Sequence, residues 1–226
     1  MKDTLKKIFK NVLVIAIYFI YIYIVIATLS LLNIDYFSLS IKNKIITYII
    51  SDICFIALLI FWIYRKELIK DIKDFKINYK QYISKYILLY FIGVIMMGVI
   101  NTLIAHFTGM KTSENEADVR LLIEKFPIYM TFSTVIYAPI VEEIIFRKAI
   151  RNIFNNKYLF IILSGVIFGC VHISNYTNIN DILFSIGYIV MGIDFAYIYY
   201  KTNNIFTTMS FHIIHNLLLL IIQFIM

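Results

Sequence analysis

Long runs of apolar residues dominate the chain and are separated by short polar segments. Seven runs stand out, at about residues 11–32, 45–64, 83–106, 128–147, 158–174, 181–200 and 205–226. Most reach the roughly 20 residues that a membrane-spanning helix needs, although the fifth is short and the fourth is interrupted. Strands do not fit, because the runs do not alternate and an open sheet cannot satisfy its backbone in lipid. The pattern predicts an all-α, polytopic transmembrane helical bundle of about seven spans.

Composition agrees with a membrane protein and excludes a soluble domain. The 226 residues are 61% hydrophobic and 15% charged, against roughly 45–50% and about 25% in soluble domains. No Gly/Ser-rich linker interrupts the chain, so we expect one membrane domain over residues 1–226. The first run follows a basic segment like that of a signal peptide, but its length and the lack of a convincing cleavage site favour a retained helix. Cys54 and Cys170 lie inside apolar runs and are expected to be small buried residues.

Basic residues mark the predicted cytoplasmic side. Lysines precede the first run, and a basic segment from residue 65 to residue 80 follows the second. The positive-inside rule places both segments in the cytoplasm, and the N-terminus with them. It also places there Arg147, Lys148, Arg151, Lys157 and Lys201. The net charge of +7 therefore needs no nucleic-acid partner.

Two segments between the runs invite separate predictions. Residues 107–126 are expected to form an external loop whose acidic residues are Glu114, Glu116, Asp118 and Glu124. Residues 65–80 carry a partial apolar stripe, so a helix along the membrane surface and a solvated connector both remain open.

A few polar side chains interrupt the last four apolar runs: Glu142, Glu143, His172, His212, His215 and Asn216. Ionisable groups at membrane depth are rare enough to be functional candidates. If residues 155–157 form a turn, Glu142 and His172 both lie roughly 22 Å from it at 1.5 Å per residue. The basic residues beside this turn imply that the hairpin projects beyond the bilayer, which places Glu142 about 8–13 Å and His212 about 13 Å below the cytoplasmic surface. The polar groups thus converge on one intramembrane layer near the cytoplasmic side.

Helical spacing separates the two glutamates. Glu143 and Arg147 are four residues apart and are expected to pair along the helix, whereas Glu142 points about 100° away, toward the bundle interior. Pro139, three residues before Glu142, is expected to loosen the helix and help open a water-accessible cavity. Gly165 and Gly169 form a small-xxx-small pattern that lets a neighbouring helix approach closely.

Each polar feature taken alone has a simpler explanation. Glutamates beside arginine form interfacial salt-bridge clusters, and a single intramembrane histidine is often a hydrogen-bonded core group. His215 has no clear motif role and is expected to be structural. Together, however, a carboxylate, two imidazoles and an amide at one level make a complete set for activating water and stabilising an oxyanion.

Three short motifs carry these residues, in this order and on separate apolar runs: EExxxR (Glu142, Glu143, Arg147), FxxxH (Phe168, His172) and HxxxN (His212, Asn216). In this order they resemble the CAAX-protease and bacteriocin-processing family of intramembrane endopeptidases, often called the Abi family, which includes the type II prenyl-protein proteases. The resemblance covers about residues 133–218, the expected catalytic core, and the first hundred residues carry no motif.

The resemblance implies hydrolysis of a peptide bond in a membrane-associated substrate. It implies that Glu142 is the general base that activates water, assisted by His172. His212 and Asn216 would bind the developing oxyanion or help to hold the water. The supporting residues would be Glu143, Arg147 and Phe168.

Metal dependence is open at this level. Glu142, His172 and His212 would suffice for a three-ligand catalytic zinc site. There is no HExxH helix, however, and only Glu143 would remain as a base if Glu142 bound the metal. We expect metal-free catalysis, with one zinc ion as the alternative.

The expected substrate follows from the resemblance and the bacterial character of this Ile-, Asn- and Lys-rich chain. In bacteria prenylated proteins are not expected, and family members there are linked to peptide maturation, bacteriocin self-immunity and quorum-signal processing. A hydrophobic or leader-bearing peptide at the cytoplasmic membrane is therefore predicted. Two alternatives remain: a non-catalytic immunity or scaffold protein that binds a peptide in the same cavity, and a small transporter with a Glu142–His172 proton relay. The lack of an evident internal repeat argues against the transporter. The sequence identifies neither the substrate nor the oligomeric state.

Overall fold

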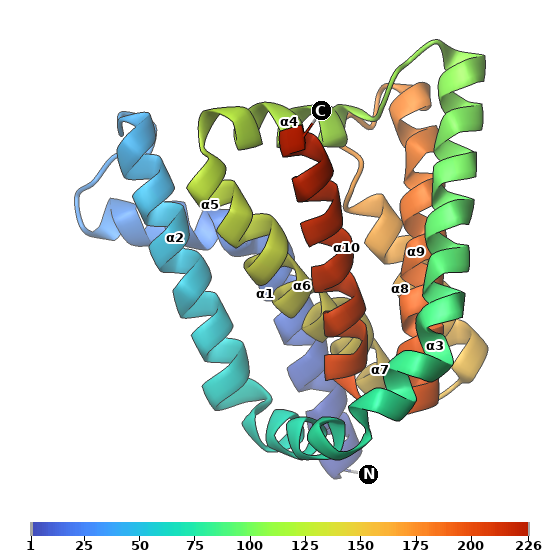
Figure 1. Ribbon diagram of the computed structural model, residues 1–226. Helices are drawn as coiled ribbons and strands as arrows, with labels where there is room; N and C mark the ends of the chain where they lie inside the picture. Colours follow the sequence, from blue (N-terminus) through green and yellow to red (C-terminus); the bar gives the residue numbers. More distant parts are fainter. Residues whose placement is uncertain (1, 226) are drawn as a thin grey trace.

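The computed structural model describes residues 2–225, which form a bundle of helices (Figure 1). No strand occurs in this range, and three short segments, η1 to η3, are π-helical. The predicted all-α class is therefore confirmed. In chain order the elements are α1 (Lys2–Leu31), α2 (Ile41–Ala57), η1 (Leu58–Ile63), α3 (Arg65–Thr108), α4 (Glu114–Lys125), α5 (Pro127–Phe132), η2 (Ser133–Tyr137), α6 (Ala138–Glu142), η3 (Glu143–Ala149), α7 (Ile150–Ile153), α8 (Lys157–Cys170), α9 (Ile179–Thr202) and α10 (Ile205–Ile225).

Most of the long helices have the dimensions of membrane spans. Among residues 2–225, six helices are long and apolar enough to cross a bilayer, at Lys2–Leu31, Ile41–Ile63, Arg65–Thr108, Pro127–Ile153, Ile179–Thr202 and Ile205–Ile225. The 14 residues of α8 extend about 21 Å, which is less than the roughly 30 Å of a hydrocarbon core. The fifth predicted run is thus a shorter apolar helix beside six candidate spans. The chain is an integral membrane protein.

The two ends of the bundle differ in charge. The N-terminus, α7, the start of α8 and the end of α9 lie at one end, the lower one in Figure 1, and α4 and the C-terminus lie at the other. Arg151, Lys157 and Lys201 therefore share the end of the N-terminus, as the charge pattern predicts. That this end faces the cytoplasm stays a prediction.

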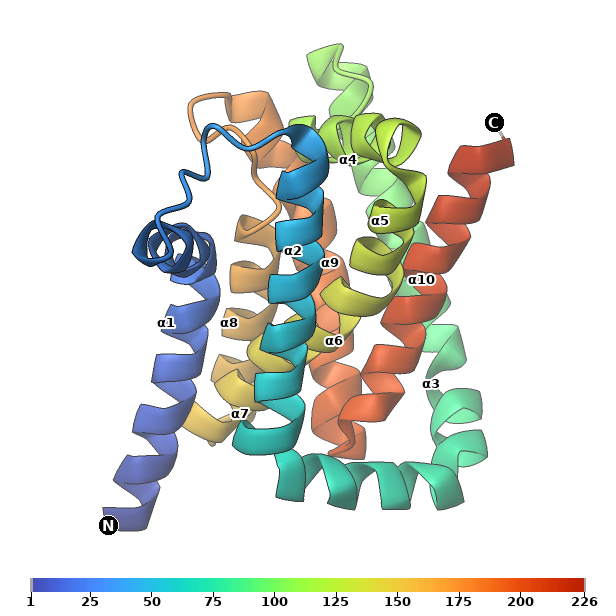
Figure 2. The same ribbon diagram turned by 90° about the vertical axis from the view of Figure 1, so that its left-hand side faces the viewer.

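The two inter-span segments at 65–80 and 107–126 are largely helical. Residues 65–80 form the first turns of α3 and lie across the lower end of the bundle (Figure 2). Residues 107–126, expected as a loop, are mostly the helix α4, which lies across the end of the bundle opposite the N-terminus (Figure 1). That this end is external stays a prediction. Gly109, with φ of 74°, ends α3 in the left-handed conformation that glycine adopts easily. The hydroxyl of Ser113 then accepts a hydrogen bond from the Glu116 N–H at 3.1 Å and caps α4.

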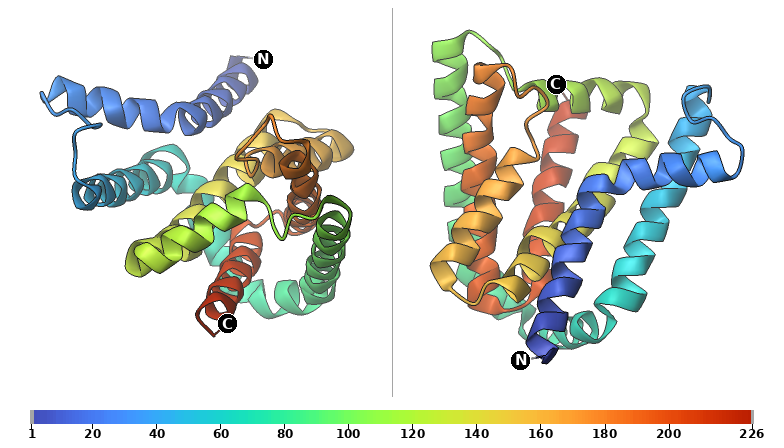
Figure 3. Two further views of the ribbon diagram at one scale, coloured as in Figure 1. Left: turned by 90° about the horizontal axis from the view of Figure 1, so that it is seen from above. Right: turned by 180° about the vertical axis from the view of Figure 1, so that it is seen from behind.

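Helices α1 and α2 lie at the edge of the bundle (Figure 3). Only Asn11, Val14 and Val25 are buried in α1. Cys54 on α2 is exposed and Cys170 at the end of α8 is half-buried, and both are free thiols. The prediction that both cysteines are buried is therefore wrong, because α2 contacts the rest of the bundle along only part of its circumference.

Two basic residues predicted to project from the membrane are buried instead. Arg147 is 0% exposed and Lys148 is 4% exposed. Each has an acidic partner: the Nε atom of Arg147 lies 3.3 Å from Glu143, and the Nζ atom of Lys148 lies 2.5 Å from Asp71 on α3. Buried charges persist in proteins when they are paired in this way. The depth predicted for Glu142 assumed that both residues were in water, and that assumption fails.

The glycines of α8 let α9 approach closely, as their spacing predicts. A Cβ atom at Gly165 would lie 2.8 Å from the backbone nitrogen of Ile193, and one at Gly169 would lie 2.9 Å from that of Ile189. Gly192 on α9 faces the same contact, since its Cβ would lie 2.9 Å from the Cα of Gly165. Such a contact forms only between small residues.

The helix that carries the two glutamates is irregular on both sides of Glu142. Pro139 has no N–H to donate to the carbonyl four residues earlier. The turn before it is the π-helical segment η2, in which the Ala138 N–H bonds to the Ser133 carbonyl. A second π-helical segment, η3, begins at Glu143. The predicted loosening around Pro139 is confirmed, and π-helical turns of this kind are frequent at functional sites.

Candidate active site

A buried ion pair anchors the helix that carries both glutamates. Glu143 and Arg147 are 0% exposed, and Arg147 Nε lies 3.3 Å from Glu143 Oε2. Arg147 Nη1 also donates to the hydroxyl of Ser164 on α8 at 2.9 Å, and that hydroxyl donates to the Phe146 carbonyl at 2.7 Å. The guanidinium lies 4.7 Å from the ring centroid of Phe168. The pair predicted from spacing is thus present, and it ties η3 to α8.

His212 on α10 lies between the two glutamates. Its Nδ1 is 3.0 Å from Glu143 Oε1, and its Nε2 is 3.8 Å from Glu142 Oε2. The Glu142 side chain is 14% exposed, whereas that of Glu143 is fully buried. A carboxylate accepts hydrogen bonds, so the contact with Glu143 assigns a proton to Nδ1 of His212. Glu143 orients the imidazole, and Glu142 stays free on the other side of it.

His172 lies in the turn that follows α8. Its Nδ1 is 2.7 Å from the Phe168 carbonyl, which can only accept, so Nδ1 donates and Nε2 remains an acceptor in the neutral ring. Tyr188 on α9 stacks on the imidazole, with ring centroids 4.2 Å apart and planes at 14°. Phe168 also contacts the imidazole, with centroids 4.7 Å apart. The ring is therefore held in one orientation.

Asn216 and His215 complete the α10 side of the site. Asn216 Nδ2 donates to the Thr134 carbonyl of η2 at 2.7 Å, in the segment that precedes Pro139. His215 Nδ1 is 3.4 Å from the hydroxyl of Tyr90 on α3, with the two rings edge to face. The π-helical segment η2 thus presents a carbonyl that fixes the Asn216 amide.

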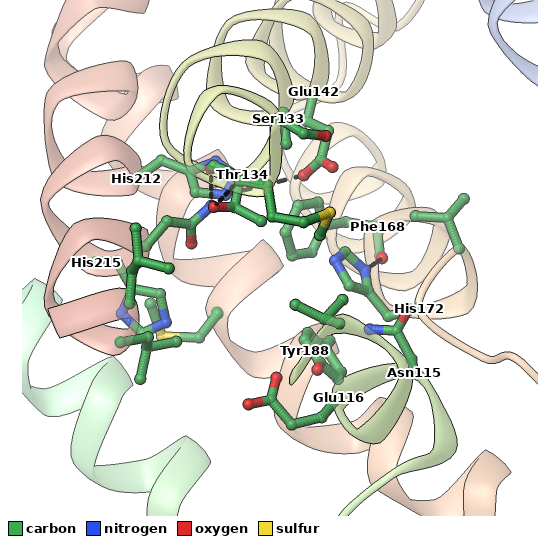
Figure 4. A pocket seen from close by; sticks show the side chains of 18 of the residues that line it. Asn115, Glu116, Ser133, Thr134, Glu142, Phe168, His172, Tyr188, His212 and His215 are labelled. Carbon is green, nitrogen blue, oxygen red and sulfur yellow. Dashed lines mark hydrogen bonds and ion pairs between the residues drawn. The ribbon is translucent and has the colours of Figure 1, made fainter. Parts of the chain in front are cut away.

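All four predicted catalytic residues line one cavity of about 320 Å³. They are Glu142, His172, His212 and Asn216. Glu142 and His212 lie on one side of the cavity, and His172 with Tyr188 and two residues of α4, Asn115 and Glu116, lies on the other (Figure 4). Phe168 also lines the cavity, whereas Glu143 and Arg147 lie behind its wall. The structure thus brings together all seven residues that the motifs single out.

Several lining residues lie outside the motifs. Tyr188 carries no sequence signal that distinguishes it from the other 17 tyrosines. The α4 wall could have been found, because Ser113 with Glu116 three residues later is a capping-box pattern. The cavity thus reaches toward the end of the bundle opposite the N-terminus.

The donor set fits a zinc site only in part. The Nδ1 atom of His212 is bonded to Glu143, and that of His172 is bonded to the Phe168 carbonyl. Such a bond from the second ring nitrogen to an oxygen is common for metal-binding histidines. Within the described residues, however, no group of three or more His, Cys, Asp or Glu side chains is placed to hold a metal ion. Glu142, His172 and His212 therefore do not form a ready three-ligand site. The expectation of metal-free catalysis stays a prediction.

The part of the chain that carries this site is similar to a known family. Residues 124–218 match the family described as type II CAAX prenyl endopeptidase Rce1-like. The family resemblance that the motifs indicate is thereby confirmed.

Two curated relatives are bacterial proteins. The chain is 30% identical over 138 residues to YdiL of Bacillus subtilis (strain 168), which is named as a membrane peptidase. It is 28% identical over 155 residues to MroQ of Staphylococcus aureus (strain USA300), named as a membrane-embedded CAAX protease. The matched regions cover 59% and 64% of this chain and only 53% and 60% of these relatives. No solved structure matches the chain.

Proposed function

We propose that this chain is an intramembrane endopeptidase that hydrolyses a peptide bond in a hydrophobic or leader-bearing peptide. The observation that supports this most is the shared cavity, in which Glu142 faces His212 while His172 and Asn216 line the same walls. A general base, imidazoles and an amide around one small space are the groups that acyl hydrolysis requires. The similarity to two named membrane peptidases supports the same reaction class.

In the proposed mechanism Glu142 removes a proton from a water molecule in the cavity. The oxygen of that water attacks the peptide carbonyl, and Glu142 later delivers the proton to the leaving amine. His172 assists through Nε2, which remains an acceptor because Nδ1 donates to the Phe168 carbonyl. Its stacking on Tyr188 holds this acceptor in place.

His212 and Asn216 are proposed to stabilise the oxyanion that forms on the carbonyl. An amide has two N–H groups, and Asn216 uses one of them on the Thr134 carbonyl, so the other is left for the oxyanion. His212 donates from Nδ1 to Glu143, which turns Nε2 toward the cavity, where a proton on Nε2 would be donated to the oxyanion. Fixed donors of this kind typically contribute ~10²–10³ in kcat.

The proposed setting is a bacterial cytoplasmic membrane, with the N-terminus in the cytoplasm. The basic lower end of the bundle and the two bacterial relatives support it.

The proposed substrate is apolar because Met97, Met130 and Met191 line the cavity beside the polar groups. Methionine side chains adapt to varied apolar surfaces.

The test is cleavage of a quenched fluorescent peptide library by the purified protein in detergent. Glu142→Gln and His172→Ala should each lower kcat, by about 10²–10⁴ for loss of a general base. The matched control is Asp194→Asn, which removes a buried carboxylate of α9 that does not line the cavity. It should cleave at close to the wild-type rate, and thermal melts confirm that every variant is folded. Elemental analysis and a chelator test the metal-free expectation, which predicts neither stoichiometric zinc nor inhibition.

Each result has a definite meaning for the proposal. Loss of cleavage in folded Glu142→Gln, but not in Asp194→Asn, supports it. A Glu142→Gln variant as active as the wild type refutes it. Absence of cleavage by the wild type, with a cellular phenotype that Glu142→Gln preserves, favours the non-catalytic immunity or scaffold protein.

A further inference from the structure

A buried carboxylate outside the catalytic cluster joins two segments that border the cavity. Asp181, in the first turn of α9, is 1% exposed. Its Oδ1 accepts a hydrogen bond from the Glu114 N–H at 2.7 Å. Its Oδ2 accepts from the N–H groups of Ser174 and Asn175 at 3.1 and 3.0 Å. One side chain therefore holds the start of α4 with one oxygen and the turn after α8 with the other.

Both of these segments contribute directly to the cavity. His172 lies two residues before Ser174 in the turn that Oδ2 holds, and Asn115 follows Glu114 at the start of α4. Both residues line the cavity, on the same side and next to Tyr188 (Figure 4). A displacement of Asp181 would therefore reach the catalytic imidazole and the α4 wall together.

The bonding pattern explains why a carboxylate is needed at this position. Three backbone N–H groups point at two oxygens, and an ionised carboxylate accepts all of them without presenting a donor. Such charge-assisted hydrogen bonds are stronger than neutral ones. The turn from 171 to 178 has no continuous helical bonding of its own. Asp181 therefore supplies the hydrogen bonds that hold the backbone at Ser174 and Asn175.

We propose that Asp181 is a positioning residue that fixes the His172 turn and the α4 wall as one unit. This role in catalysis rests on the proposed peptidase function, whereas the joining of the two segments does not. Asp181 acts through the backbone of the turn and touches no reacting atom. Its loss should lower kcat more than it changes KM, because His172 is misplaced while the apolar walls of the cavity remain.

Hydrogen exchange and kinetics on Asp181→Ala and Asp181→Asn test the proposal. Asp181→Ala should speed amide exchange in both 113–117 and 171–178 and lower kcat about tenfold to a hundredfold, the scale expected for a misplaced catalytic group. In Asp181→Asn the single amide oxygen can accept hydrogen bonds from only one of the two segments, so the other segment loses its bonds. The kcat should fall only if the segment that loses them is 171–178. The control Ser113→Ala removes the hydroxyl that caps α4 by accepting from the Glu116 N–H at 3.1 Å, a bond made within the α4 segment. It should leave kcat close to the wild-type value.

The outcomes separate this proposal from the proposed function. Faster exchange in 171–178 together with a matching loss of kcat supports a positioning role, since a merely stabilising residue would lower the melting temperature without this correspondence. Unchanged exchange in both segments, or unchanged kcat while 171–178 exchanges faster, overturns it. If Asp181→Ala does not fold, Asp181→Asn provides the same comparison. Wild-type protein that cleaves no peptide refutes the function, and the exchange data still decide whether Asp181 joins the two segments.

Discussion

Replacing Gly169 with alanine should push α8 away from α9. The new Cβ would lie 2.2 Å from Cγ1 of Ile189, 2.9 Å from the backbone nitrogen of Ile189 and 2.9 Å from the carbonyl oxygen of Ser185. Carbon atoms pack best at about 3.5–4.0 Å. The Ile189 side chain is able to rotate, but the two backbone atoms are not, so the helices must separate.

The magnitude follows from two opposing effects. Overpacking costs about 1–3 kcal/mol, and alanine is better than glycine in a helix by up to ~1 kcal/mol. With the full helix preference subtracted, the net loss for Gly169→Ala is up to ~2 kcal/mol, or a fall of up to ~8 °C in Tm for a chain of this size. The control is Gly98→Ala in α3, where a Cβ would meet nothing within 4 Å. There only the helix preference acts, and the protein should gain up to ~1 kcal/mol.

Thermal unfolding of both variants in the same detergent measures the difference. Gly169→Ala should also lower kcat, because α8 carries Phe168 and leads directly into the His172 turn. Equal melting temperatures for Gly169→Ala and Gly98→Ala would show that the α8–α9 contact is not tight, and the reasoning from the Cβ distances would then be wrong.

Three further predictions concern the site. Arg147→Met removes the guanidinium partner of the buried Glu143, which keeps only its contact with His212, and should cost about 3–5 kcal/mol in thermal unfolding. Glu143→Leu should restore part of this loss, and a double variant no more stable than the single one would contradict the prediction. Pro139→Ala should lower the cleavage rate by allowing a more regular helix beside Glu142, and full activity with an unchanged structure would show that Pro139 does not help to open the cavity. Tyr188→Phe keeps the ring that stacks on the catalytic imidazole and should lower kcat less than Tyr188→Ala; equal losses would exclude a role for stacking.

Local signals in the sequence predict the turns and the pairing along one helix. Asn156 caps α8 by accepting from the Leu159 N–H at 3.0 Å, where the sequence predicts a turn. Asn203, with φ of 48°, turns the chain between α9 and α10. The Glu143–Arg147 pair follows from their four-residue spacing. These features depend on residues that are close in sequence, which is why they could be predicted.

Features that depend on distant residues could not be predicted in this way. Lys148 is buried because Asp71, 77 residues earlier in the chain, pairs with it, and in sequence it looks like any other basic residue at a helix end. Asp181 has the same character, since its three donors come from two segments that only the fold brings together. The π-helical segments could not be predicted either, because the period of 3.6 residues describes a regular α-helix only.

The π-helical segment η2 also determines how the helix before Glu142 responds to insertions and deletions. An i→i+5 hydrogen bond encloses one residue more than the i→i+4 bond of an α-helix. Deleting one residue from Ser133–Tyr137 would convert this turn to a regular α-helix, with the flanking turns kept nearly in place, and would remove the local widening of the backbone at Thr134. Thr134 would then no longer present its carbonyl to Asn216. Deleting one residue there should therefore abolish peptide cleavage while leaving a well-formed membrane helix. A change in the length of this helix would alter the catalytic site and not the fold.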